Sequence, residues 1–108
     1  MGHELQDRVS LEMGRRVAAG LEKHPEWLEL ARRNLERWRA NNSDAPSLLR
    51  CYDTWARLLD RPVGEIVAML VRDDEEGRQY RQNSPFAGVL SPAEVWAIKR
   101  DARETIAG

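Results

Sequence analysis

The chain contains 108 residues and has little of the side-chain chemistry on which catalytic and metal sites depend. Cys51 is the only cysteine, which excludes an internal disulfide framework and fits a reducing compartment. We interpret it as a small apolar residue of a helix, not as a reactive thiol. His3 and His24 are the only histidines, and neither has another histidine or a cysteine three or four residues away, so we expect no metal site. With no histidine near Cys51 and no glycine-rich phosphate loop, the sequence predicts no catalytic residues, no cofactor and no enzymatic activity.

Long apolar runs are missing as well. No window approaches the roughly 18 continuous apolar residues of a membrane span. The first residues, Met1 to Glu4, lack the apolar stretch of a secretion signal. We therefore expect a cytoplasmic protein with no membrane partner.

Neither sign of charge is in excess. Seventeen Lys and Arg residues stand against eighteen Asp and Glu residues, which gives a net charge of -1 and no global field to attract phosphates. Several arginines follow an acidic residue by one helical turn, a spacing that favours local ion pairs of about 0.2–0.5 kcal/mol each. The expected pairs are Glu12 with Arg16, Glu29 with Arg33, and Asp53 with Arg57. DNA is thus a possible partner but not the favoured one.

The pattern that is present is helical. Apolar residues recur at three- and four-residue intervals, and nothing alternates at the two-residue period of a strand for more than a few residues. The length matches one domain, since single cores typically occupy roughly 100–150 residues. We predict an all-α fold with one compact domain of five or six helices over residues 1–108. The expected helices cover about 4–21, 25–40, 46–59, 62–70, 73–82 and 92–106.

Each expected helix carries one apolar stripe that should face the core. The stripes are Leu5, Val9, Met13, Val17 and Leu21; Trp27 or Leu28, Ala31, Leu35 and Trp38; Leu48, Leu49, Tyr52, Trp55, Ala56 and Leu59; Val63, Ile66, Val67 and Leu70; and Val95, Ile98, Ala102 and Ile106.

The clearest helix start is that of the last helix. Ser91 and Glu94 have the spacing of a capping box, and Pro92 occupies the first helical position. The least certain helix is the one over 73–82, because Gly77 within it costs about 1 kcal/mol relative to alanine.

The third and fourth expected helices, joined by a short turn at Asp60-Arg61-Pro62, have the layout of a helix-turn-helix. The second of the two reads "VGEIVAMLV" and has no row of polar side chains that could read base edges. We therefore place it in the core. A DNA-binding transcriptional regulator, acting on its own operon, stays the alternative function.

The stretch "RQNSPFAGVLSPAEVWAIKR", residues 81–100, forms a corner between two helices. Pro85 stops the first helix and Gly88 permits the bend. Phe86 has two possible orientations, toward a partner or into the domain's own core, and both agree with polar side chains from Arg81 to Ser84 that face outward. Trp96 lies off the apolar stripe of the last helix, so it either wraps onto an adjacent helix or anchors a partner, as large aromatic residues often do.

The runs "RQNSPFAGVLSPAEVWAI" and "WARLLDRPVGEIVAMLVRDDEEGRQY" resemble a group of short bacterial and archaeal-type proteins. In that group a Trp…Leu-Leu pattern is followed by Arg-Gln-Ser-Ser-Pro-Phe-Ala-Gly-Val-Leu. These proteins resemble the small antitoxin-like partners encoded beside nucleotidyltransferase toxins of the abortive-infection type. The resemblance covers about Leu48 to Arg100, and Asn83 stands where the pattern has serine.

The resemblance implies a protein of a toxin-antitoxin system that binds its cognate toxin and blocks access of nucleotide or tRNA to the active site. It places Arg81, Gln82 or Asn83 near a pocket built for phosphates, where an arginine could pair with metal-binding carboxylates. The partner-binding residues we expect are Arg81, Gln82, Asn83, Ser84, Phe86, Leu90, Trp96 and Arg100. A structural or oligomerisation module is a third possibility, although it explains the corner less well.

Overall fold

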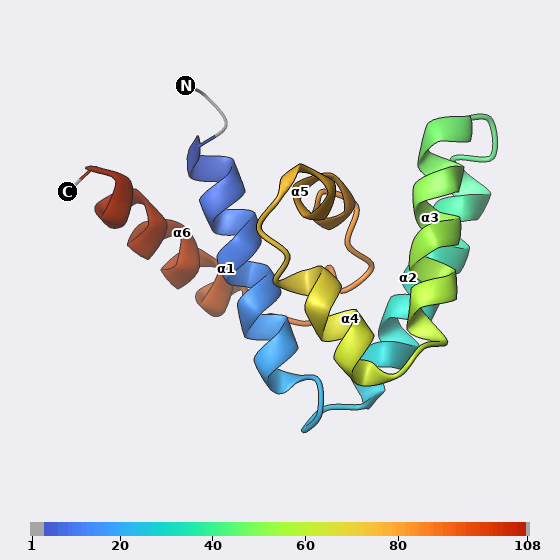
Figure 1. Cartoon of the computed structure of the whole chain (residues 1–108), viewed down its shortest axis with the longest axis horizontal. Coiled ribbons are helices and arrows are strands. Elements are labelled where there is room, and N and C mark those ends of the chain that lie inside the picture. The colour runs from blue at the N-terminus through green and yellow to red at the C-terminus, as the bar shows by residue number, and fades with distance from the viewer. Residues whose placement is uncertain (1–3, 108) are drawn as a thin grey trace.

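The computed structural model describes residues 4–107, and these residues form six α-helices and no strand (Figure 1). The helices are α1 (Glu4–Gly20), α2 (Glu26–Asn41), α3 (Pro46–Leu59), α4 (Val63–Leu70), α5 (Glu75–Arg81) and α6 (Pro92–Ala107). The predicted all-α class is confirmed. His3, one of the two histidines of the metal argument, lies outside the described residues.

The helices form two pairs, with two short helices between them. α2 and α3 form a hairpin on one side, α1 and α6 pack together on the other, and α4 and α5 lie between them (Figure 1). α1 contacts α4, α5 and α6. An ion pair of 3.7 Å joins Arg16 in the last part of α1 to Glu94 in the first turn of α6. The two helices therefore run antiparallel, and the start of α1 and the end of α6 lie on the same side of the molecule (Figure 1).

The core is built from residues of the predicted stripes of α1, α2, α3, α4 and α6, together with residues of the corner. Trp55 is fully buried at its centre, and Ile66 and Leu70 of α4 are buried against it. The buried residues of the cluster are Val17, Leu21, Ala31, Leu35, Tyr52, Trp55, Leu59, Ile66, Leu70, Phe86, Leu90 and Ile98. The placement of the apolar fourth helix in the core is confirmed.

The prediction for the stripe of α1 is confirmed only in part, because Val17 and Leu21 are buried in the core and the other three residues are not. Leu5, Val9 and Met13 are only half-buried, whereas Leu11 and Gly14 are buried. A Cβ atom on Gly14 would overlap the carbonyl oxygen at the end of α4, so α1 crosses that end in direct contact. The face that points at α4, α5 and α6 is therefore rotated from the stripe, and part of the stripe stays accessible.

The ion pairs also differ from the prediction. Among the described residues, none of the three expected pairs forms. Arg16 pairs with Glu94 of α6, and Asp53 pairs with Arg39 of α2. Glu12 pairs within α1, but with a different arginine. In the folded chain, a charged residue of another helix, or a different residue of the same helix, lies closer to each of these side chains than the expected partner does.

The start of α6 is the one the sequence predicts. The backbone N–H of Ser91 donates to the Glu94 carboxylate at 3.0 Å, and the N–H of Glu94 donates to the Ser91 hydroxyl at 3.1 Å. The pKa of Glu94 lies below its usual range, chiefly because of the Ser91 backbone N–H and further because of the Ser91 hydroxyl and Arg16. This reciprocal cap sets where the corner ends and α6 begins.

Candidate functional site

The proline corner is closed onto the core. Phe86 is 3% exposed, and its ring meets the Trp55 ring edge-on with centroids 6.3 Å apart. Pro85 and Leu90 are buried with it. Gly88 has a φ of 92°, so the predicted bend is confirmed and relies on glycine. Of the two orientations left open for Phe86, the structure adopts the inward one.

Asn34 of α2 holds this corner, and the sequence did not single it out. Its side-chain amide donates hydrogen bonds to the carbonyl oxygens of Pro85 at 2.8 Å and Ala87 at 3.1 Å. Its own carbonyl accepts one from Arg37 at 2.9 Å. The one feature of the sequence that could have predicted this role is the position of Asn34 between Ala31 and Leu35, on the apolar face of the helix. A polar residue there needs internal partners, and the corner supplies them.

The prediction that Arg81 faces outward is wrong. Its side chain is 7% exposed and its Nε donates to the Ser10 hydroxyl at 3.1 Å. Its Nη1 donates to the carbonyl oxygens of Leu70, at 3.5 Å, and of Arg72. Carbonyl groups at a helix C-terminus have no partner within the helix, and Arg81 satisfies that of Leu70, the last residue of α4, and that of Arg72 just beyond it. Burial lowers the pKa of the guanidinium.

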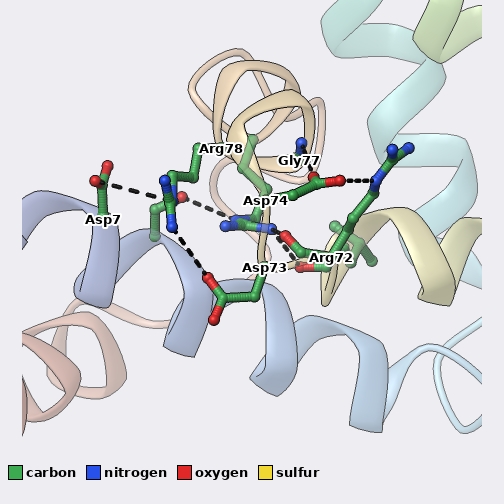
Figure 2. A network of polar contacts seen from close by, with 9 residues as sticks. Asp7, Arg72, Asp73, Asp74, Gly77 and Arg78 are labelled. Carbon is green, nitrogen blue, oxygen red and sulfur yellow. Dashed lines mark hydrogen bonds and ion pairs between the residues drawn. The ribbon is translucent and has the colours of Figure 1, made fainter.

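Acidic residues around Arg81 offset this buried charge. Figure 2 shows Asp7 and Asp73 on either side of Arg78, at 4.0 Å and 3.6 Å from its guanidinium. Both carboxylates also favour the charged form of Arg81. Arg81 thus joins α1, α5 and the end of α4 as a structural residue.

The first turn of α5 belongs to the same network. The Asp74 side chain accepts a hydrogen bond of 2.8 Å from the backbone N–H of Gly77 and pairs with Arg72 at 2.7 Å (Figure 2). The Gly77 N–H, followed by Arg72, lowers the pKa of Asp74. A Cβ on Gly77 would overlap the Arg72 carbonyl oxygen, so the glycine that weakens the helix by propensity permits its close packing.

An open cleft of about 740 Å³ lies beside the corner. This volume falls within the roughly 300–1,000 Å³ typical of ligand sites in proteins. Its walls come from α1, α6, the corner and the hairpin: Leu5, Val9, Met13 and Val17; Val95, Lys99 and Arg103; Gln82, Asn83 and Ser84; and Trp38, Asn42 and Tyr52. The accessible stripe of α1 is therefore one wall of this cleft.

Six of the eight residues predicted to bind a partner line the cleft, namely Arg81, Gln82, Asn83, Ser84, Phe86 and Leu90. Phe86, Leu90 and Arg81 are buried in its base, whereas Gln82 is exposed and Asn83 and Ser84 are half-buried. The cleft is the feature that brings these residues together.

The two remaining predicted residues lie on the outer side of α6. Trp96 is 62% exposed, and the Arg100 guanidinium lies 5.4 Å from the centre of its ring. Trp96 therefore does not wrap onto an adjacent helix. Ile106, expected to face inward, is 39% exposed.

The charged residues that line the cleft all carry positive charge. They are Arg81 at its base and Lys99 and Arg103 on α6. The ion pairs of α6 within the described residues use Glu94, Arg100 and Asp101, and Lys99 and Arg103 are exposed. A chain with a net charge of -1 thus has a locally cationic cleft.

The Cys51 thiol is half-buried next to the corner. Burial raises its pKa, and a contact with the Asn83 side chain opposes part of that shift. A raised pKa leaves less of the reactive thiolate at neutral pH.

Within the described residues, no three His, Cys, Asp or Glu side chains gather where they could hold a metal ion. None of the described helices is long and apolar enough to cross a membrane.

Comparison of the chain with protein families, with curated proteins and with solved structures finds no match.

Proposed function

We propose that this chain is a non-enzymatic, antitoxin-like protein that binds a partner nucleotidyltransferase toxin and neutralises it by occluding its active site. The observation that carries the proposal is the open apolar cleft, because it gathers six of the residues expected to bind a partner, and Gln82, Asn83 and Ser84 among them are accessible. An accessible apolar surface of this kind, rimmed by polar groups, is typical of protein interaction sites.

The outer face of α6 extends this surface. Trp96 is a large exposed aromatic residue with an arginine against its ring, and residues of both types dominate the energetics of many interfaces. The cleft and this face together form the toxin-binding surface, with the cleft holding one segment of the toxin and Trp96 contacting the surface beside it.

The role of Arg81 in this proposal is indirect. Its guanidinium is engaged with Ser10 and the end of α4, so it is not available to the metal-binding carboxylates of a toxin. Contacts with the toxin's pocket fall instead to Gln82 and Asn83, which follow it at the edge of the cleft. A substitution of Arg81 or Phe86 would test folding before it tested binding.

The proposal expects a nucleotidyltransferase gene beside the gene for this chain, and the experiment is co-expression with that enzyme. Expression of the enzyme alone should stop growth, and co-expression should restore it, with both chains recovered as one complex. Transfer of a labelled nucleotide by the purified enzyme should fall in proportion to the amount of this chain added. A complex that leaves transfer unchanged contradicts occlusion, and the absence of both complex and rescue contradicts the whole proposal.

Variants of exposed residues make this experiment specific. Trp96→Ala and Gln82→Ala should weaken the complex without changing the fold. Leu30→Ala, a half-buried residue of α2 that does not line the cleft, serves as the control for a general loss of apolar surface. Equal behaviour of Trp96→Ala and Leu30→Ala would remove α6 from the proposed interface.

A DNA-binding regulator is the second function left open by the sequence. α4, the helix in the recognition position, exposes Gly64, Glu65 and Ala68, and these carry no positive charge toward a groove. DNA retardation that weakens steeply with salt would favour this function over neutralisation.

A further inference from the structure

The cleft has a length and direction set by α1. Leu5, Val9, Met13 and Val17 line it at four-residue intervals. At 1.5 Å per residue this row extends for about 18 Å, or a little over three helical turns, with Leu5, Val9 and Met13 accessible and Val17 buried at its end. Rows at four-residue spacing are the ridges that interdigitate when two helices pack. An elongated wall of this form is complementary to a second helix.

The opposite sides of the cleft differ in chemistry. The hairpin contributes Trp38 and Tyr52, whose rings lie 5.7 Å apart. α6 contributes Val95 and then Lys99 and Arg103, one and two turns further along. Because the charged residues lining the cleft are all cationic, a bound helix meets apolar groups along its centre and positive charge on one flank.

We propose that the cleft is the docking site for an amphipathic helix of the partner protein, about three turns long, with acidic residues along the flank that faces Lys99 and Arg103. Its apolar side chains recur at i, i+3 or i+4, and i+7, the arrangement by which helices bind grooves. The assignment of this helix to the toxin rests on the proposed function. The acidic flank follows from charge complementarity, which sets partner choice and association rate at interfaces.

The direct test uses a pair of labelled synthetic peptides of about eleven residues, stapled into a helix, with leucine at the same apolar positions. One peptide has glutamate along the flank and the other has lysine. Fluorescence anisotropy should show the glutamate peptide binding about tenfold more tightly at low salt, with the difference shrinking as salt screens the charges. Equal binding, or no binding of either peptide, would overturn the proposal.

The variant that tests the cations is the double substitution Lys99→Glu and Arg103→Glu. It should abolish or reverse the preference for the glutamate peptide. The control is Arg33→Glu with Arg57→Glu, which changes the charge equally at two exposed positions outside the cleft. Circular dichroism should show all these proteins equally helical. The same loss of preference in the control would mean that the net charge of the protein, and not the two cations of the cleft, determines which peptide binds more tightly.

A small apolar acid could occupy the same volume, so laurate is tested in parallel. Strong binding of laurate without binding of the glutamate peptide would assign the cleft to a small molecule and overturn the proposal.

Binding of the toxin distinguishes the docking of a helix in the cleft from the neutralisation of the toxin. A toxin complex that the Lys99→Glu and Arg103→Glu variant forms as well as the unmodified chain overturns the docking helix but leaves neutralisation intact. A glutamate peptide that binds with the expected charge dependence, when the toxin does not bind at all, contradicts the proposed function and supports the docking site.

Discussion

The corner at residues 81–90 and the helix that follows it come from one continuous stretch, yet they treat their apolar side chains in opposite ways. Phe86 and Leu90 of the corner are buried, whereas Trp96 and Ile106 of α6 are exposed. The corner is held from outside its own sequence, by Asn34 and the Trp55 ring. The comparison separates residues that build the cleft from residues that are free to contact a partner.

This difference has a physical cause. The corner is short, its backbone is tied to Asn34 of α2, and its Phe86 ring packs against the Trp55 ring of the core. α6 buries Ile98 and Ala102 against α1, turns Val95 toward the cleft, and leaves Trp96 and Ile106 exposed. Aromatic content alone therefore does not distinguish the two regions.

The largest loss of stability is expected from Phe86→Ala, a substitution in the buried corner. Removing a buried phenylalanine typically costs about 3–5 kcal/mol of stability. That is a large share of the roughly 5–15 kcal/mol available to a domain. Urea denaturation measures it, and Phe86→Leu, which keeps most of the apolar volume, should lose less. An unchanged midpoint for Phe86→Ala would show that the corner is not part of the core in solution.

The next effect concerns the wall of the cleft. Gly14→Ala introduces a Cβ that overlaps the Leu70 carbonyl oxygen, and such overpacking typically costs about 1–3 kcal/mol. Gly64→Ala is the matched control, because its Cβ meets nothing within 4 Å. Thermal denaturation of the two variants should show a loss for Gly14→Ala alone. Equal stability would mean that α1 does not cross the end of α4 so closely.

A smaller loss is expected from Asn34→Ala, which removes the donors to the Pro85 and Ala87 carbonyl groups. Two hydrogen bonds at about 0.5–1.5 kcal/mol each suggest a loss of about 1–3 kcal/mol, reduced because alanine favours the helix. Asn41→Ala, at an exposed position of the same helix, should change little. Hydrogen exchange of the corner amides should accelerate in Asn34→Ala only. Equal exchange rates of these amides in the two variants would show that the Asn34 hydrogen bonds do not hold the corner.

On the other side of the comparison, Trp96→Ala should change the free energy of unfolding by no more than about 0.5 kcal/mol, as for most surface substitutions. Its indole is exposed and its contact is with Arg100 on the same helix. Tryptophan is nevertheless a residue whose loss weakens interfaces. Denaturation and toxin co-purification therefore give opposite results for Phe86 and Trp96, and a destabilised Trp96→Ala protein would remove the contrast.

The smallest effect is kinetic. Because burial raises the pKa of Cys51, the midpoint of its alkylation rate against pH should lie above that of a free cysteine. Asn83→Ala removes a contact that lowers this pKa, so the midpoint should move further upward. A midpoint at or below the free value would place the thiol in solvent and detach Asn83 from it.

The elements themselves were predictable, since periodicity and start signals depend on residues close together in the chain. The capping box of Ser91 and Glu94, the glycine bend and the apolar fourth helix all have the predicted form. The ion pairs, the direction of Arg81 and the role of Asn34 were not predictable. Each depends on a partner in another element, at separations of up to 71 residues for Arg81 and Ser10.

Local spacing was thus enough to specify six helices and the corner between the last two, because a helix and its caps are decided within a few residues. Which apolar stripe became core and which became the wall of a cleft was settled by packing. α4, α5 and α6 cover one side of α1, and the Gly14 contact sets its rotation. The row from Leu5 to Met13 stays accessible because α4, α5 and α6 pack against other residues of α1. The sequence of α1 alone does not show which of its residues those helices will contact.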